Sequence, residues 1–276
     1  MIDYIRRKIE KKKIKKTFKE YGYEIKKFNI DDIGEVEYAQ WLHPFEKPKE
    51  VTLSNIQFYK KLASPGAMII DIGAHTGDTS VPMGLAVGKE GLVLALEPNK
   101  YVYKILEKNA TLNKDLTNII PLCKAATDEN KEFIFNYSDA SFCNGGLLSQ
   151  IQNQKHNHNY TLKVEGLNLE EYLLKNYSKE ILQKIELIKV DAEGYDKEIL
   201  KTLPNILKEY KPNLMIECYK KLNTEERHEL FDVVDSFDYN LYYLENFEED
   251  GKKIKLDKSN MTDSKHFEML AIHKSK

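Results

Sequence analysis

The sequence predicts an α/β fold, in which a mostly parallel sheet of seven strands has helices on both faces and one antiparallel edge strand. Short apolar segments alternate with helical segments of about ten to fifteen residues, which is typical of right-handed crossovers between parallel strands. The apolar segments are continuous rather than alternating, as expected of strands that are buried on both faces.

The expected strands are short apolar runs that end at glycine, proline or polar residues. The five expected parallel strands cover residues 67–73, 92–98, 118–126, 185–194 and 213–219. Two further runs, at residues 239–245 and 266–273, lie close together in the chain. We expect them to pair as a hairpin that makes one edge of the sheet antiparallel.

Helices are expected where the segments between the strands have helical spacing of apolar residues. They cover residues 54–62, 78–87, 99–113, 195–203 and 224–236. An insert at residues 130–168, with an alternating strand at 132–137, separates the third and fourth parallel strands. Long structured loops beside a sheet commonly carry specificity, so we expect this insert to recognise the substrate.

The expected sheet and helices make residues 66–276 of the 276-residue chain one domain. We interpret residues 1–65 as a basic N-terminal helix and a lid segment. Residues 1–20 carry nine Lys or Arg and three acids, so this basic arm has a net charge of +6 and the remaining chain sums to −8. The arm is either a helix attracted to an anionic membrane or a charged partner, or a solvated helix that packs weakly on the protein itself.

The composition excludes several classes of protein. No apolar run approaches the ~18 residues that a membrane helix needs, and the N-terminus has no apolar core of secretory type. Cys123, Cys143 and Cys218 are too few and too scattered for a disulfide framework. We therefore expect a cytoplasmic protein, associated with a membrane only if the arm binds one. The acidic body argues against nucleic-acid binding.

The most informative segment follows the first strand, where Asp71, Gly73, Gly77 and Asp78 stand at a strand-to-helix turn. Glycines at such a point let the backbone approach a ligand at the carboxyl edge of the sheet. The Gly73-x-x-x-Gly77 spacing differs from the G-x-G-x-x-G of dinucleotide-binding proteins, and no Gly-Lys-Ser/Thr phosphate loop follows. An acid at Asp71 would repel a pyrophosphate and attract a cation.

A second acid, Glu97, ends the second strand, 24 residues after Gly73. A carboxylate at this point is placed to bind the two ribose hydroxyls of an adenosine. An adenosine that carries positive charge fits both acids, so the sequence predicts S-adenosylmethionine as the cofactor. A tight turn without a ligand is the alternative interpretation of the glycines alone.

Four segments of the chain resemble the FkbM family of S-adenosylmethionine-dependent methyltransferases. They are residues 71–78, 96–99 (LEPN), 124–128 (KAATD) and 187–200 (LIKVDAEGYDKEIL). The resemblance covers roughly residues 66–220 and implies a Rossmann-like class I methyltransferase fold and O-methylation, often of sugar hydroxyls. It also implies a set of cofactor contacts: Asp71, Gly73, Ala74, His75, Gly77, Asp78, Glu97, Asn99, Ala125 and Ala126.

Three carboxylates are candidates for the chemistry. Asp191 and Glu193 follow the fourth strand, and Glu217 ends the fifth. A sugar hydroxyl is a poor nucleophile, so a base must remove its proton or a metal must weaken the O–H bond. Converging carboxylates can share one proton, which raises one pKa toward that of a useful base. We predict these three residues as catalytic, without a metal.

Two alternatives stay open for these carboxylates. Asp191 and Glu193 can cap the following helix and hold the turn at Gly194. Two of the carboxylates can instead hold Mg²⁺, which would bind two adjacent hydroxyls of a diol.

The insert holds the candidate substrate contacts. Ser141, Asn144, Gly145 and Gly146 are expected to shape a hydrogen-bonding pocket for a polyol, or else to form a solvated loop. The favoured function is O-methylation of a sugar or glycoconjugate. The alternatives are methylation of a small natural product or a protein side chain, nucleotide binding without catalysis, and nicotinamide-dependent oxidoreduction, which the glycine spacing disfavours.

Overall fold

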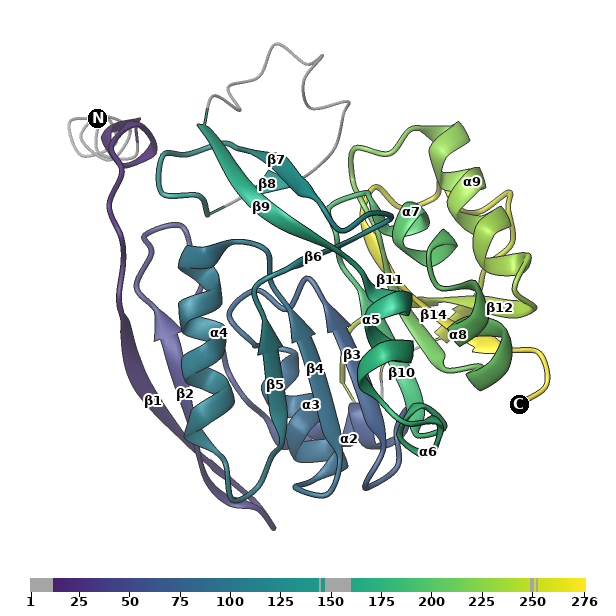
Figure 1. Ribbon diagram of the computed structural model, residues 1–276, viewed down its shortest axis with the longest axis horizontal. Helices are drawn as coiled ribbons and strands as arrows, with labels where there is room; N and C mark the ends of the chain where they lie inside the picture. The colour runs from purple at the N-terminus through teal and green to yellow at the C-terminus, as the bar shows by residue number, and fades with distance from the viewer. Residues whose placement is uncertain (1–11, 144, 147–159, 249–250, 252) are drawn as a thin grey trace.

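The computed structural model describes residues 12–143, 145–146, 160–248, 251 and 253–276, and these contain a central sheet of eight strands (Figure 1). The strand order across this sheet is β13-β12-β14-β11-β10-β3-β4-β5. In that order, the strands span Lys253–Lys255, Tyr239–Leu244, Phe267–His273, Asn213–Cys218, Ile185–Val190, Met68–Ile72, Leu92–Leu96 and Ile119–Leu122.

The five predicted parallel strands are neighbours in this sheet, from β11 through β10, β3 and β4 to β5. The prediction for the other side was partly wrong. β12 and β14 do pair antiparallel, but β14 also pairs antiparallel with β11, so the antiparallel strand lies inside a mixed sheet. β14 is largely buried and suits an interior position, whereas the exposed β13, with sequence KIK, suits the edge.

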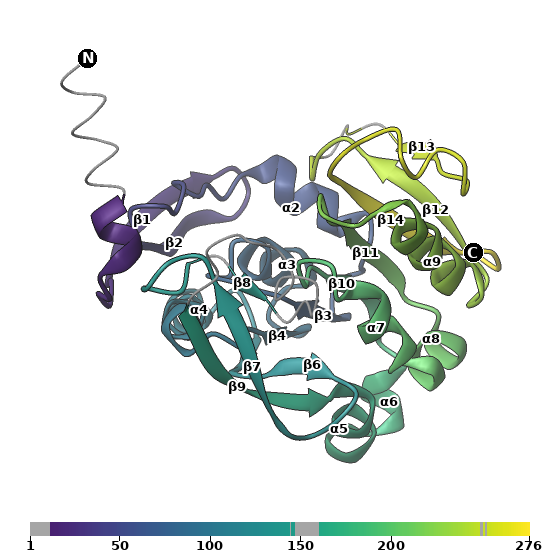
Figure 2. The same cartoon turned by 90° about the horizontal axis from the view of Figure 1, so that it is seen from above.

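Helices cover both faces of the sheet (Figure 2). Neighbouring residues of β3 enter different cores, since Ile70 packs in one apolar cluster and Ile69 in the other. One face carries α5 (Leu169–Asn176), α6 (Lys179–Leu182), α7 (Asp196–Lys201), α8 (Pro204–Tyr210) and α9 (Thr224–Asp235). The opposite face carries α2 (Leu53–Lys60), α3 (Ser80–Val87) and α4 (Lys100–Leu112). All five predicted helices are confirmed, while α5, α6 and α8 were not predicted.

The insert forms a second sheet, with the strand order β6-β9-β7-β8. These strands span Ala125–Thr127, Tyr160–Asn168, Glu132–Tyr137 and Gly145–Gly146 in that order. The predicted strand at 118–126 is therefore two strands, because β5 belongs to the central sheet and β6 pairs with β9 of the insert. The alternating strand predicted at 132–137 is confirmed as β7.

The N-terminal region contains a hairpin that was not predicted. β1 (Tyr23–Ile30) and β2 (Gly34–Trp41) pair antiparallel, and β2 packs against α4 (Figure 1). Residues 12–16 of the basic arm are helical, whereas residues 1–11 lie outside the described residues. The lid role of residues 1–65 stays a prediction.

No helix among the residues that the structure describes has the length and apolar character that a membrane span requires.

Candidate active site

A cavity of about 370 Å³ lies at the carboxyl ends of β3, β4 and β10, where open α/β sheets bind ligands. Its other walls come from the insert and from Glu46 and Lys49 of the N-terminal region. Its volume lies in the lower part of the range of about 300–1,000 Å³ for ligand sites. The sequence-predicted residues that line it are Gly73, His75, Asp78, Glu97, Asn99, Ala125, Ala126, Gly145, Asp191 and Glu193.

Gly73 lets the loop after β3 pass directly against the loop after β10. Its φ of +76° lies in the left-handed region, and a Cβ at this position would lie 1.9 Å from the carbonyl oxygen of Asp191. No side chain fits there, so the glycine is required by the close approach of the two loops.

Three predicted cofactor contacts do not line the cavity: Asp71, Ala74 and Gly77. Asp71 is fully buried, accepts hydrogen bonds from Thr79 Oγ1 (2.8 Å) and Ser80 Oγ (2.6 Å), and lies 3.3 Å from Lys189 Nζ. The cation that Asp71 attracts is therefore a lysine of the protein. This corrects the expectation that Asp71 faces a cationic ligand, and we interpret it as a positioning residue for the loop after β3.

Ala74 and Gly77 shape the same loop. The backbone N–H of Ala74 donates to Leu96 O at 2.9 Å, which fastens the loop to the end of β4. Gly77 has a φ of +89°, and a Cβ there would lie 3.0 Å from Leu106 Cδ1 of α4. Both residues position the loop rather than contact the cavity.

Glu97 stands at the end of β4 as predicted, and its carboxylate reaches the cavity. Its two oxygens accept hydrogen bonds from the backbone N–H groups of His75 (3.0 Å) and Asn99 (2.8 Å). Burial raises the pKa of Glu97 above its ordinary value, although nearby His75 and these hydrogen bonds oppose the rise. Each oxygen keeps acceptor capacity for a ligand hydroxyl. Asn99 caps α4 by accepting from Tyr101 N.

Asp191 and Glu193 line the cavity beside Gly73. Lys189 Nζ lies 3.3 Å from Asp191 Oδ2, and the Asp191 side chain is 37% exposed. Burial, and then the charge of Asp191, raise the pKa of Glu193, while the Tyr219 hydroxyl hydrogen-bonds to it. A carboxyl with a raised pKa is suited to general-base catalysis near neutral pH.

The turn after β10 is held by Asp196 rather than by Asp191 or Glu193. Its carboxylate accepts from the backbone N–H groups of Ala192 (3.3 Å) and Gly194 (3.0 Å). The alternative in which Asp191 and Glu193 hold this turn is therefore wrong, and both carboxylates are available to the cavity.

Glu217 is not among the residues that line the cavity, and its role as a catalytic residue stays a prediction. Burial, and then the nearby Asp191, Asp196 and Glu193 carboxyls, raise the pKa of Glu217 to about 10. A carboxyl with its pKa raised in this way holds its proton more tightly than an ordinary glutamate. Its register neighbour across the sheet is another acid, Glu268 of β14.

The four predicted substrate contacts do not all lie in the same place. Gly145 lines the cavity, and a Cβ on it would lie 2.4 Å from Asn136 O, because β8 pairs there with β7. Gly146 belongs to β8, and Asn144 lies outside the described residues. Ser141 is buried and accepts from the backbone N–H of Lys19 at 3.0 Å. Its hydroxyl therefore joins the basic arm to the insert, and its role as a substrate contact stays a prediction.

The model of the methyltransferase FkbM domain matches residues 71–247, which is more than half of the chain. The chain belongs to the FkbM methyltransferase family. A probable cobalt-precorrin-6B C(15)-methyltransferase (decarboxylating) of Sulfurisphaera tokodaii is 35% identical over 80 residues, which are 29% of this chain. The matched residues span 41% of that curated relative, which is less than half of its length.

Two solved methyltransferase structures resemble this FkbM protein. An FkbM methyltransferase from Methylobacillus flagellatus KT has a TM-score of 0.45 at 14% identity, with 79% of this chain and 50% of that chain covered. An S-adenosylmethionine-dependent O-methyltransferase from Thermotoga maritima has a TM-score of 0.43 at 12% identity, with 91% and 78% covered.

S-adenosylmethionine is the cofactor of this family, and the cavity of the FkbM protein fits it. Glu97 offers two acceptor oxygens for a ribose diol, and Ala125 and Ala126 form a small apolar wall for the adenine edge. Lys124, next to them, also lines the cavity. Among the described residues, no group of three or more His, Cys, Asp or Glu is arranged to hold a metal ion.

Four residues of the FkbM site were not predicted from the sequence: Lys189, Asp196, Glu46 and Lys49. Lys189 carried a signal, because a lone charge in an apolar strand predicts a buried partner. Glu46 and Lys49 stand between Pro44 and Pro48 or just after them, in a segment without periodicity. No local pattern could have placed them beside the glycine loop.

Proposed function

We propose that this FkbM protein transfers a methyl group from S-adenosylmethionine to a hydroxyl of a sugar or glycoconjugate. The observation that carries the proposal is that one cavity is lined both by Glu97, suited to a ribose, and by Asp191 and Glu193, suited to deprotonate an acceptor. A polyol acceptor agrees with the polar character of this wall.

In this reaction some residues would bind the cofactor and others would take the proton of the acceptor. Glu97, His75 and Asn99 hold the adenosine part of the cofactor, which supplies an activated methyl group when bound. Asp191 takes the proton of the acceptor hydroxyl, and the Lys189 ammonium at 3.3 Å keeps its carboxylate oriented. The exposure of Asp191 lets the proton leave to solvent.

Calorimetry tests the cofactor. We expect the protein to bind S-adenosylmethionine and S-adenosylhomocysteine but not NAD. Substitution Glu97→Ala should weaken binding of both by about tenfold or more, because the ribose loses its charged acceptor. Binding of NAD without S-adenosylmethionine would contradict the proposal.

Methyl transfer from labelled cofactor to a panel of acceptors tests the reaction. Nucleotide sugars and oligosaccharides are expected to accept, and Asp191→Asn should lower turnover by about two orders of magnitude or more with cofactor binding unchanged. Asp115→Asn, on an exposed residue at the opposite end of β5, is the control. Because the curated relative is named for a precorrin, a tetrapyrrole belongs in the panel, and transfer to it alone would overturn the sugar acceptor.

Metal dependence is tested by chelation. Activity should persist in EDTA, because the proposed base is a carboxylate. Full loss of activity with rescue by Mg²⁺ would instead favour the diol mechanism.

A further inference from the structure

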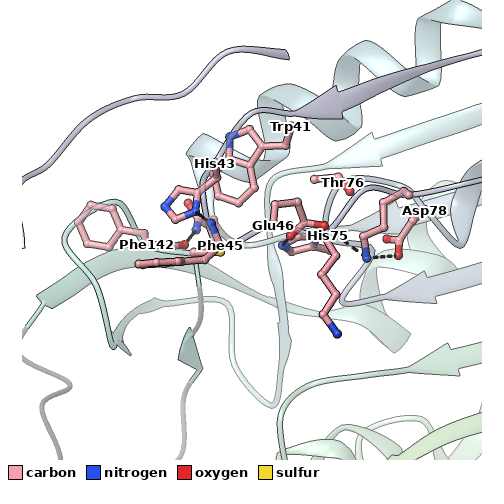
Figure 3. A network of polar contacts seen from close by, with 12 residues as sticks. Trp41, His43, Phe45, Glu46, His75, Thr76, Asp78 and Phe142 are labelled. Atoms are coloured by element: carbon pink, nitrogen blue, oxygen red, sulfur yellow. Dashed lines mark hydrogen bonds and ion pairs between the residues drawn. The ribbon is translucent and has the colours of Figure 1, made fainter. Parts of the chain in front are cut away.

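The cavity has a charged corner that the family domain does not supply by itself. Glu46 and Lys49 come from the loop between β2 and α2, ahead of the matched residues 71–247, whereas His75 and Asp78 follow β3. Figure 3 shows Glu46, His75 and Asp78 gathered together, away from His43 and Phe142.

The contacts in this corner do not use the full hydrogen-bonding capacity of Lys49 and Glu46. Lys49 Nζ donates to Asp78 Oδ2 at 2.6 Å, which uses one of its three N–H groups, and lies 3.4 Å from Glu46 Oε1. Glu46 Oε2 lies 3.9 Å from His75 Nε2. The Glu46 side chain is 8% exposed, and within the described part of the chain its Oε1 makes no hydrogen bond.

The charges of this corner do not balance. One ammonium faces two carboxylates, so the group has a net charge of −1 when His75 is neutral. Asp78 is matched by Lys49, since burial alone would raise the pKa of Asp78 but Lys49 brings it below its ordinary value. Glu46 shares this ammonium at the longer distance of 3.4 Å, so one negative charge of the pair stays unbalanced. A buried carboxylate of this kind is costly unless a cation joins it.

We propose that Glu46 and Lys49 form a subsite for a zwitterionic α-amino acid group, in which Glu46 binds the ammonium and Lys49 the carboxylate. The proposal rests on the proposed function, because the amino-acid end of S-adenosylmethionine is the group with this chemistry. It assigns to Glu46 the attraction for a cation that the sequence had suggested for Asp71, whose carboxylate is occupied by Lys189.

Two ligands separate this subsite from the rest of the cavity. S-adenosylhomocysteine carries the amino-acid group, whereas 5′-methylthioadenosine has the same adenosine and a thioether but no amino-acid group. Lys49→Met and Glu46→Gln are each compared with a neighbour in the same loop, Lys47→Met and Glu50→Gln, whose side chains are exposed. Binding is measured by calorimetry, with thermal unfolding recorded for every variant.

We expect Lys49→Met and Glu46→Gln each to weaken S-adenosylhomocysteine by about tenfold or more and to change 5′-methylthioadenosine by less than about twofold. Both control variants should bind both ligands as the natural protein does. Retained binding of 5′-methylthioadenosine also reports an intact cavity, and Glu46→Gln, which keeps the shape of the side chain, provides the test if Lys49→Met does not fold.

Equal weakening of both ligands would show that the two residues only hold the loop, and unchanged binding of both would show that they contact neither. Either result overturns the subsite while leaving the proposed function in place. If the natural protein binds neither ligand, the proposed function fails and the subsite fails with it.

Discussion

Gly73 stands where the two loops of the active site touch. Substitution Gly73→Ala should lower the free energy of unfolding by about 3 kcal/mol, because the new Cβ meets the Asp191 carbonyl and the left-handed φ disfavours alanine. Chemical denaturation measures this cost, and cofactor binding should be lost as the loops separate. Gly66→Ala is the control, since Gly66 has a similar φ of +82° but nothing within 4 Å of a Cβ.

Glu217 should make stability depend on pH. Its pKa is raised from 4.5 to about 10 in the folded protein, so between these values the folded state binds a proton that the unfolded state has released. Stability from this group is therefore complete at low pH and falls as the pH rises from about 5 toward 10. The pKa of Asp196 is likewise raised by burial, to about 8, and that of Glu268 to about 7, and both add to the same slope.

The variant Glu217→Gln tests whether Glu217 causes this pH dependence of stability. A glutamine resembles the protonated acid and does not titrate, so the variant should gain stability relative to the natural protein at about pH 9 and much less at about pH 5. Urea unfolding at the two pH values measures the difference. Glu245→Gln, on an exposed residue, should follow the natural protein, and an equal effect of Glu217→Gln at both pH values would contradict the prediction.

At the scale of elements, α4 holds the N-terminal hairpin through two asparagines. The buried Asn109 amide accepts from Ala39 N at 2.6 Å and donates to Ala39 O (3.1 Å) and Thr76 O (2.7 Å). Asn113 makes a matching pair of bonds to the backbone of Glu37. The side-chain amides thus satisfy the free edge of β2 as a neighbouring strand would.

Loss of Asn109 should cost more than loss of Asn113. Asn109→Ala leaves buried backbone groups of both β2 and the glycine loop unpaired, and we expect a loss of about 3 kcal/mol. Asn113→Ala, whose bonds are only partly buried, should cost about 1 kcal/mol. Denaturation of both variants gives the comparison, and equal costs would show that the bridge to Thr76 contributes nothing.

The basic N-terminal arm is a part of the molecule to which no binding partner has yet been assigned. Its described part packs on the insert, where Ala140 N donates to Lys15 O at 2.9 Å, and on α4, where the Phe18 ring lies 5.3 Å from that of Tyr101. The lysines at 12, 13 and 16 are exposed. We propose that they contact an anionic membrane surface.

The protein should then co-sediment with anionic vesicles at low salt and dissociate at high salt, since salt screens exposed charges. Replacing Lys12, Lys13 and Lys16 by Gln should weaken this binding, and neutral vesicles are the control. Equal recovery with neutral and anionic vesicles would support the interpretation as a solvated helix.

The features that could be predicted from the sequence alone are the parallel strands, the glycine loop, the position of Glu97 and the family. These features are local: continuous apolar runs report burial on both faces, and a glycine or an acid at a strand end reports its position at the carboxyl edge. The N-terminal hairpin was not predicted, because its strands are partly exposed and apolar and polar residues alternate only weakly along them.

Which acids face the cavity depends on contacts between distant parts of the chain. Lys189 is the register neighbour of Asp71, and Glu217 that of Glu268, so these pairs share one face of the sheet although more than 50 residues of chain separate each pair. Strand register brings a lysine to Asp71 and removes that acid from the ligand. It also brings a second acid, Glu268, to Glu217, whose pKa is raised first by burial and then by Asp191. The loop with Glu46 and Lys49 reaches the cavity through packing of β2 on α4, which no short segment of sequence encodes.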